Sequence, residues 1–157
     1  MNEFKDIIDV NRNAYNQLAS EFNSRESDLA DYKQKLKDYI SQFVKGHENV
    51  LEIGPGTGHL LQILEDLGCR TTAIELSERM CEFARKNSPK TVILNQDIFT
   101  VNFCMQQFDI ICALALIHTI PSKEAGSFME KVKYWLKDDG LFIFDTVMYD
   151  ESKEVFI

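Results

Sequence analysis

The chain has 157 residues, a hydrophobic fraction of 45% and a formal net charge of −8 at pH 7. This length fits one domain with its own core, and this hydrophobic fraction argues against an intrinsically disordered chain. The acidic balance, without a basic run, disfavours sequence-independent binding to nucleic acid, because phosphate contacts need lysine and arginine.

The N-terminal residues, the apolar runs and the cysteines of the sequence indicate the cellular compartment of the protein. The first residues, MNEFKDIIDVNRN, are too polar for the apolar region of a signal peptide, and no apolar run approaches the length of a membrane span. Cys69, Cys81, Cys104 and Cys112 are scattered without a CxxC pair. We therefore expect a cytoplasmic protein with reduced cysteines and no membrane partner. The histidines are isolated from one another, so we expect no metal site.

Residues 1–46 carry apolar side chains at helical spacing. One stripe comprises Ile7, Tyr15, Leu18 and Phe22. A clearer stripe follows and comprises Leu29, Tyr32, Leu36, Tyr39, Ile40 and Phe43. Because charged residues fall on the other faces, we expect helices that lie against a core, with Gly46 at the C-terminal end of the second. We expect these helices to cover a cofactor and substrate site.

Residues 47–157 alternate between short apolar runs and amphipathic segments. Strands are predicted at 50–53, 71–76, 91–94, 108–113 and 141–147. Ser77 is predicted to cap one of the intervening helices. Ser122 is predicted to cap another helix, which is followed by a turn at Asp139-Gly140. The inner face of this helix is predicted to carry Phe128, Val132, Trp135 and Leu136.

This alternation predicts an α/β fold. We expect a Rossmann-like, doubly wound and mostly parallel sheet, with right-handed crossovers and helices on both faces. The N-terminal helices of residues 1–46 and the core of residues 47–157 would form one structural domain.

The most informative segment joins the first predicted strand to the next helix and reads VLEIGPGTG over residues 50–58. Gly54, Gly56 and Gly58 let the backbone turn sharply and let a ligand approach without a Cβ in the way. The following helix presents free N–H groups and the positive end of its dipole. This unit predicts a nucleotide-type site at the carboxyl edge of the sheet, in preference to a turn that needs glycine for sterics alone.

The residue after this loop weakens two kinds of pyrophosphate site. The dinucleotide fingerprint G-x-G-x-x-G requires glycine at position 59, which is His59 here. The phosphate loop of NTPases requires Gly-Lys-Ser or Gly-Lys-Thr, whereas Gly58 is followed by His59 and Leu60. A nicotinamide-dependent oxidoreductase is therefore disfavoured.

The segment from Glu52 to Gly58 has the pattern G-x-G-x-G, preceded by an acidic residue inside the strand. It resembles the first motif of the class I S-adenosylmethionine-dependent methyltransferases, especially their small-molecule branch. In that family the loop packs against the methionine part of the cofactor and the early acidic residue supports the site. The resemblance implies those roles for Glu52, Gly54, Gly56 and Gly58, with S-adenosylmethionine as cofactor and S-adenosylhomocysteine as product.

Glu75 closes the second predicted strand and precedes Leu76, which we include in the predicted cofactor site. An ionised carboxylate accepts hydrogen bonds through both oxygens, so Glu75 suits the two hydroxyls of a ribose. The same acidic position recurs in dehydrogenases, so Glu75 indicates a ribose without choosing the cofactor. The alternative is a solvated acid that the dipole of the next helix favours.

Further cofactor contacts follow from the resemblance. Asp97 would receive the adenine amino group and Ile98 would pack on the ring, although Asp97 as a simple turn former competes with that role. Ala113, in a segment that resembles the family's fourth strand, would lie beside the methionine end. Tyr15, in a segment that resembles a helix over the cofactor, would face the sulfonium, and packing alone explains it equally well.

No obligatory catalytic residue is predicted, because the methyl group of the cofactor is already activated. The protein has to align the reactants and exclude water. A general base is needed only if the nucleophile is protonated. His118 and Asp145, at strand ends, are the candidates, and a lone histidine such as His118 is more often structural.

The resemblance stops early, because the family usually adds two more strands after the fifth and the sequence ends at Ile157. We expect either a truncated chain or a short variant completed by another chain, with a homodimer through the exposed edge of the sheet as one form of completion. Two functions then compete: a methyltransferase for a small-molecule acceptor, and a catalytically incomplete cofactor-binding module or regulatory partner.

Overall fold

The structure, a computed structural model, describes residues 3–25 and 30–145. Within these residues, a parallel five-stranded sheet has the order β3-β2-β1-β4-β5. The strands are β1 (Asn49–Ile53), β2 (Arg70–Glu75), β3 (Val92–Asn95), β4 (Phe108–Ala113) and β5 (Leu136–Phe144). The chain moves from β1 to one side through β2 and β3 and then returns to β1's other side with β4. Ligands of such sheets bind at this reversal, outside the carboxyl ends of the strands.

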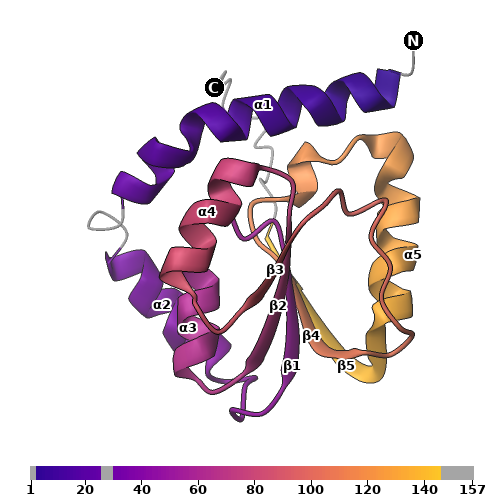
Figure 1. Cartoon of the computed structure of the whole chain (residues 1–157). Coiled ribbons are helices and arrows are strands. Elements are labelled where there is room, and N and C mark those ends of the chain that lie inside the picture. The colour runs from indigo at the N-terminus through magenta and orange to yellow at the C-terminus, as the bar shows by residue number, and fades with distance from the viewer. Residues whose placement is uncertain (1–2, 26–29, 146–157) are drawn as a thin grey trace, which may run out of the picture.

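Helices cover both faces of the sheet, as predicted. They are α1 (Glu3–Ser24), α2 (Ala30–Ile40), α3 (His59–Asp66), α4 (Glu78–Asn87) and α5 (Ala125–Trp135). Helices α2, α3 and α4 lie on one side of the sheet and α5 on the other, and α1 crosses one end of the molecule (Figure 1). The Rossmann-like α/β prediction is confirmed. No helix among the described residues is long and apolar enough to cross a membrane.

Side chains of β1 alternate between the two faces of the sheet, so this short strand contributes to the hydrophobic core on each face. Leu51 and Ile53 belong to the core under α5, together with Trp135. Val50 belongs to the core under α2 and α3. A strand buried on both faces reads as a continuous apolar run, so the charged side chain of Glu52 is an exception that needs a local cause.

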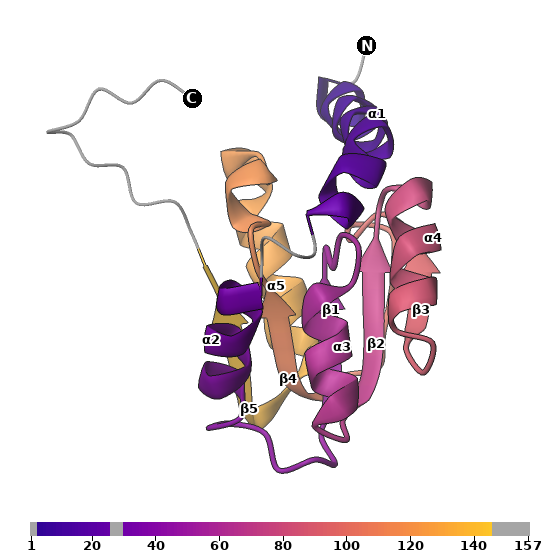
Figure 2. The same ribbon diagram turned by 90° about the vertical axis from the view of Figure 1, so that its left-hand side faces the viewer.

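Helix α1 is fastened to α4 by polar contacts. Asn16 Oδ1 accepts hydrogen bonds from Ser77 Oγ (2.7 Å) and from the backbone N–H of Arg79 (3.2 Å). Leu18 and Phe22 of the predicted apolar stripe stay 41% and 39% exposed, so that stripe is not the main buried face. These contacts hold α1 over the ends of β2 and α4, and the turned view shows it standing clear of the sheet (Figure 2).

Some predicted element boundaries were right and others were wrong. Ser77 caps α4 as predicted and accepts a hydrogen bond from Met80 N. The prediction that Ser122 caps the next helix is wrong, because Ser122 is the first residue of a 3-10 turn (Ser122–Glu124) that leads into α5. Helix α5 ends before Leu136. Leu136 instead begins β5, because it pairs with Phe108 of β4.

The predicted turn at Asp139-Gly140 is part of β5. The pairing of β5 with β4 steps from Phe108–Leu136 to Ile110–Leu141, so the segment between Leu136 and Leu141 bulges out of the ladder and the strand continues. Residues 146–147 of the predicted fifth strand lie outside the described residues, as does Leu29 of the second helical stripe.

Gly46 does not end α2, which stops at Ile40. Its φ is +93°, and a Cβ there would lie 2.7 Å from the carbonyl oxygen of Leu67. The need for glycine at this position therefore comes from the close approach of two segments that are distant in sequence.

Candidate functional site

A cavity of about 410 Å³ lies beside the carboxyl ends of β1, β2 and β4. Its floor is the glycine loop that follows β1, and further walls come from the ends of β2 and β3, from the loop after β4 and from α1. Most of the lining side chains are apolar. The ionisable exceptions are few: Glu52, Glu75, Asp97, His59 and His118, together with the phenols of Tyr15 and Tyr32.

The glycine loop forms the floor through backbone conformations that side chains disfavour. Gly54 and Gly56 line the cavity with φ values of +71° and +56°. A Cβ at Gly54 would lie 2.9 Å from Leu116 Cδ1, whereas a Cβ at Gly56 would meet nothing within 4 Å. Glycine is therefore favoured at both positions by the backbone angle, and a side chain at Gly54 would also have to displace the end of the Leu116 side chain.

Gly58 has a different role from the one that the resemblance implies. It does not line the cavity, and a Cβ on it would lie 3.2 Å from Ala84 Cα and 3.3 Å from Ser88 Oγ. Its φ of +92° also lies in the left-handed region. The structure thus places Gly58 where α3 begins against the end of α4.

Glu75 connects the end of β2 to the glycine loop. Its Oε2 accepts a hydrogen bond from Gly56 N (3.1 Å) and its Oε1 accepts one from Ser77 N (2.8 Å). Burial raises the pKa of Glu75, and these backbone donors partly oppose that rise. Each carboxylate oxygen keeps a further lone pair, so Glu75 can still accept a hydrogen bond from a ligand.

Glu52 is a buried acid of the cavity wall. Its side chain is 3% exposed, and its Oε2 has no hydrogen-bond partner among the described residues. Burial, and then the charge of nearby Glu75, raise the pKa of Glu52 to about 8. A buried polar atom without a partner costs free energy, so an acid kept here on an otherwise apolar strand suits a ligand that brings a donor or a positive charge.

Asp97 behaves as a turn former and also lines the cavity. Its Oδ1 accepts a hydrogen bond from Phe99 N (2.9 Å), and its carbonyl oxygen accepts from Thr100 N (2.9 Å) and Val101 N (3.1 Å). Ile98 lies beside it on the same wall. The competing turn role is therefore present, and it leaves Asp97 Oδ2 available to a ligand.

The structure brings most of the predicted site residues together. The ones that line the cavity are Tyr15, Glu52, Gly54, Gly56, Glu75, Leu76, Asp97, Ile98 and His118. Ala113 does not line it: this residue is fully buried and pairs with Phe144, and the lining begins one residue later, at Leu114.

Asp145 does not line the cavity either. Its Oδ1 accepts a hydrogen bond from the backbone N–H of Ala115, which has a φ of +51°. A left-handed backbone is uncommon for alanine and needs support from its surroundings. Asp145 is thus placed to fix the turn that aims Leu116 and His118 at the glycine loop.

Several lining residues have no counterpart in the sequence prediction. Ile7, Ile8 and Asn11 of α1 face the cavity together with Tyr15, and helical spacing from Tyr15 would have found Asn11 one turn earlier. His59, which by sequence argues only against a dinucleotide site, lies in the wall with its Nε2 3.2 Å from Thr57 Oγ1. No sequence pattern indicated that contact.

Comparison with protein families matches residues 51–144 to the methyltransferase domain family. The chain belongs to this family. Its fold agrees, because a solved complex titled DhpI-SAM-HEP superposes with a TM-score of 0.77 over 93% of this chain and 68% of that one, at 23% identity. The prediction of a class I S-adenosylmethionine-dependent methyltransferase domain is confirmed.

Curated relatives carry the same family name at modest identity. An uncharacterized methyltransferase of Oceanobacillus iheyensis is 29% identical over 129 residues, which cover 80% of this chain and 60% of the relative. Ribosomal RNA small subunit methyltransferase A of Malacoplasma penetrans is 28% identical over 100 residues, which cover 64% of this chain and 35% of that protein. The chain therefore spans little more than half the length of the first relative and about a third of the second.

Proposed function

We propose that this methyltransferase domain binds S-adenosylmethionine in the cavity and transfers its methyl group to a small-molecule acceptor. The observation that carries the proposal is the pair of buried carboxylates, Glu52 and Glu75, on either side of the glycine loop. S-adenosylmethionine carries a sulfonium, an ammonium and a carboxylate in its methionine part, besides a ribose and an adenine. The cavity offers an acceptor for the ammonium, for the ribose hydroxyls and for the adenine amino group. The residues present therefore fit the cofactor.

Each wall residue has a role in this arrangement. The unpartnered Oε2 of Glu52 would accept the ammonium of the methionine part, and Glu75 would accept the ribose hydroxyls while still holding Gly56. Asp97 Oδ2 would accept the adenine amino group, with Ile98 against the ring. The backbone of Gly54 and Gly56 would lie along the cofactor, with Tyr15 and the rest of α1 above it as a cover.

The cofactor supplies an activated methyl group when it is bound, so the residues of the chain have to orient the acceptor and exclude water. Helix α1 and the loop after β4 form two of the cavity walls. His118 lies in that loop and is the candidate that takes a proton from the acceptor. Asp145 is a positioning residue in this scheme, because it acts through the backbone of Ala115.

The charge of the chain and of the cavity wall supports a small-molecule acceptor. Among the described residues that line the cavity there is no lysine or arginine, and the chain as a whole carries a net charge of −8. Nucleic-acid binding depends on cations that neutralise phosphates. These facts favour a small-molecule acceptor over nucleic acid for this chain.

A second candidate is a domain that binds the cofactor without turnover. This candidate is favoured by the length of the match, because the chain spans 60% of the length of the Oceanobacillus relative. Cofactor binding and conversion to S-adenosylhomocysteine therefore have to be measured separately.

Calorimetric titration with S-adenosylmethionine and S-adenosylhomocysteine tests the proposal. We expect both to bind in the micromolar range and Glu75→Ala to weaken both by about a hundredfold, because it removes a charged acceptor. Asp109→Ala is the matched control, since it removes a carboxylate from the opposite edge of the sheet and should leave the affinities unchanged. Glu75→Gln, which keeps the size of the side chain, guards against loss of fold.

Absence of binding by the intact chain would contradict the proposal, and so would binding of NAD in place of both sulfur ligands. Binding without any formation of S-adenosylhomocysteine in the presence of acceptors would favour the second candidate.

A further inference from the structure

The part of the cavity that faces the proposed cofactor site is built from apolar side chains. Ile7 and Ile8 enter it from α1, and Leu116, Ile120 and Pro121 enter it from the loop after β4. Both segments are fixed from elsewhere: α1 by the contacts of Asn16 to Ser77 and Arg79, and the loop by the contact of Asp145 to Ala115. These walls are therefore a formed surface, and apolar walls favour an apolar occupant.

The cavity wall holds three acids and two histidines. Glu52, Glu75 and Asp97 line it, and no lysine or arginine among the described residues does so. A second anion in such an enclosure would meet carboxylates in a medium less polar than water, without a guanidinium or ammonium to pair with it. A phosphate or carboxylate on the acceptor would thus find no lysine or arginine among the described residues of the wall.

This inference rests on the proposed function and specifies its substrate class. We propose that the acceptor is an uncharged, mainly apolar molecule with one hydroxyl nucleophile, and that phosphorylated or carboxylated acceptors are excluded. The polar groups near the apolar walls, Asn11, Tyr15, Thr119 and His118, suffice to orient a single hydroxyl. They do not suffice to neutralise an anion.

The transfer balances without a further reactant. A lone pair of the hydroxyl oxygen forms the new bond to the methyl carbon, and the bond from that carbon to sulfur breaks with its electron pair remaining on sulfur. The sulfur thereby loses its positive charge. The proton of the hydroxyl passes to the imidazole of His118 or to water.

Matched pairs of small molecules test this substrate class. The full chain is first saturated with S-adenosylhomocysteine, and binding is then measured by ligand-observed NMR for a panel of aromatic and aliphatic alcohols. Each alcohol is compared with its own phosphate monoester. We expect alcohols of the panel to bind and their phosphate esters to bind at least about tenfold more weakly.

Variants of α1 locate the effect in the cavity. Asn11→Lys places a cation in the wall and should narrow the difference in affinity between each alcohol and its phosphate ester. Asn11→Met, whose side chain is similar to lysine in length but uncharged, should not. Asn13→Lys adds the same charge to an exposed position of the same helix and should also leave the difference unchanged.

The outcomes separate the two proposals. Phosphate esters that bind as tightly as their alcohols, or a panel in which no alcohol binds, would overturn the inference about the acceptor. An equal response of Asn11→Lys and Asn13→Lys would also overturn it, because the preference would then reflect overall charge. Failure of the chain to bind S-adenosylhomocysteine in the first step would instead contradict the proposed function.

Discussion

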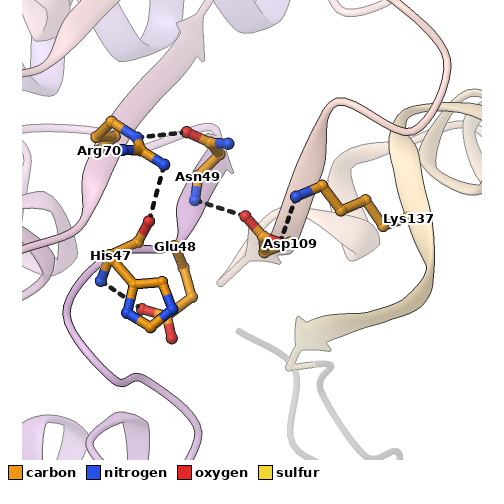
Figure 3. A network of polar contacts seen from close by, with 6 residues as sticks. All are labelled: His47, Glu48, Asn49, Arg70, Asp109 and Lys137. Atoms are coloured by element: carbon orange, nitrogen blue, oxygen red, sulfur yellow. Dashed lines mark hydrogen bonds and ion pairs between the residues drawn. The ribbon is translucent and has the colours of Figure 1, made fainter.

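Acidic side chains lie at both the amino and the carboxyl edge of the sheet, but their hydrogen bonding differs between the two edges. At the amino edge, Glu48 accepts hydrogen bonds from the backbone N–H groups of Lys45 (2.7 Å), Gly46 (3.0 Å) and His47 (3.1 Å). Asp109 accepts hydrogen bonds from Asn49 N (2.8 Å) and from Lys137 Nζ (2.6 Å) in the same region (Figure 3).

Arg70 completes this amino-edge network. Its guanidinium donates to Asn49 Oδ1 (2.8 Å) and to the carbonyl oxygen of His47 (3.0 Å) (Figure 3). Every one of these contacts is made by groups of the chain itself. The network thereby ties the starts of β1, β2, β4 and β5 to the connection between α2 and β1.

The pKa values of these acids also differ between the amino and the carboxyl edge of the sheet. Burial alone would raise the pKa of Glu48, but its backbone donors bring that pKa below the ordinary value. Lys137 and Asn49 likewise lower the pKa of Asp109. At the carboxyl edge, burial raises the pKa of both Glu52 and Glu75. Satisfied acids stabilise the fold at one edge, and an unsatisfied acid at the other edge is left for a ligand.

The largest effect is expected where the glycine loop meets the cavity. Gly54→Val places a branched side chain at a φ of +71° and against Leu116 Cδ1. We expect loss of cofactor affinity by about a hundredfold or more and a loss of stability of about 1–3 kcal/mol. Calorimetric titration and urea unfolding would measure the two quantities.

Gly126→Ala is the control for this change. Gly126 lies in α5 with an ordinary helical backbone, and a Cβ there would meet nothing within 4 Å. This substitution should raise stability by about 0.5–1 kcal/mol and leave affinity unchanged. A tolerated valine at Gly54 would show that the loop does not approach the cofactor as proposed.

A pH dependence of stability should come from Glu52. Its pKa rises from 4.5 to about 8 on folding, so its contribution is full below pH 4.5 and is lost as the pH rises through 8. Between those values we expect the ligand-free chain to lose up to about 1.4 kcal/mol of stability per pH unit. Urea unfolding across the window would measure the slope, and Glu52→Gln should remove it. An unchanged slope in that variant would exclude Glu52 as its source.

The stability contribution of Glu48, at the amino edge, should depend on pH in the opposite sense. Because the pKa of Glu48 is lowered on folding, its contribution is present above its unfolded pKa and is lost as the pH falls. Glu48→Ala leaves several backbone N–H groups without their acceptor, so we expect a loss of about 2 kcal/mol at neutral pH. Cofactor affinity should stay unchanged. An affinity loss in a folded Glu48→Ala variant would show that the two edges are coupled.

The smallest effect is expected at the fastening of α1. Asn16→Ala removes the acceptor of Ser77 Oγ and Arg79 N, which should cost about 1 kcal/mol and loosen α1. Faster proteolysis within residues 3–25 would report the loosening, with bound S-adenosylhomocysteine restoring protection. Asn13→Ala, at an exposed position, is the control, and equal cleavage of both variants would contradict the role of Asn16.

The order of strands and helices could be predicted from the sequence because each depends on a local pattern. The run from Phe108 to Ala113 is apolar except for Asp109 and forms β4 with those bounds, and Ser77 caps α4 through a contact three residues away. The glycine loop and Glu75 were found by motif and spacing, and both reach the cavity. The N-terminal helices were expected to cover the site, but Ile7, Ile8 and Asn11 were not named as lining residues, because they reach the cavity only through the placement of α1.

What the sequence by itself determined is the class of fold, the family and the residues nearest the glycine loop. The tertiary structure alone decided that Gly58 serves contact with Ala84, that Ala113 stays inside the sheet, and that Asp145 holds Ala115. Local patterns reflect hydrogen bonds and burial within a few residues, which the sequence displays directly. These three roles depend on groups from about 26 to about 31 positions away in the chain, whose approach is fixed only when the layers pack together.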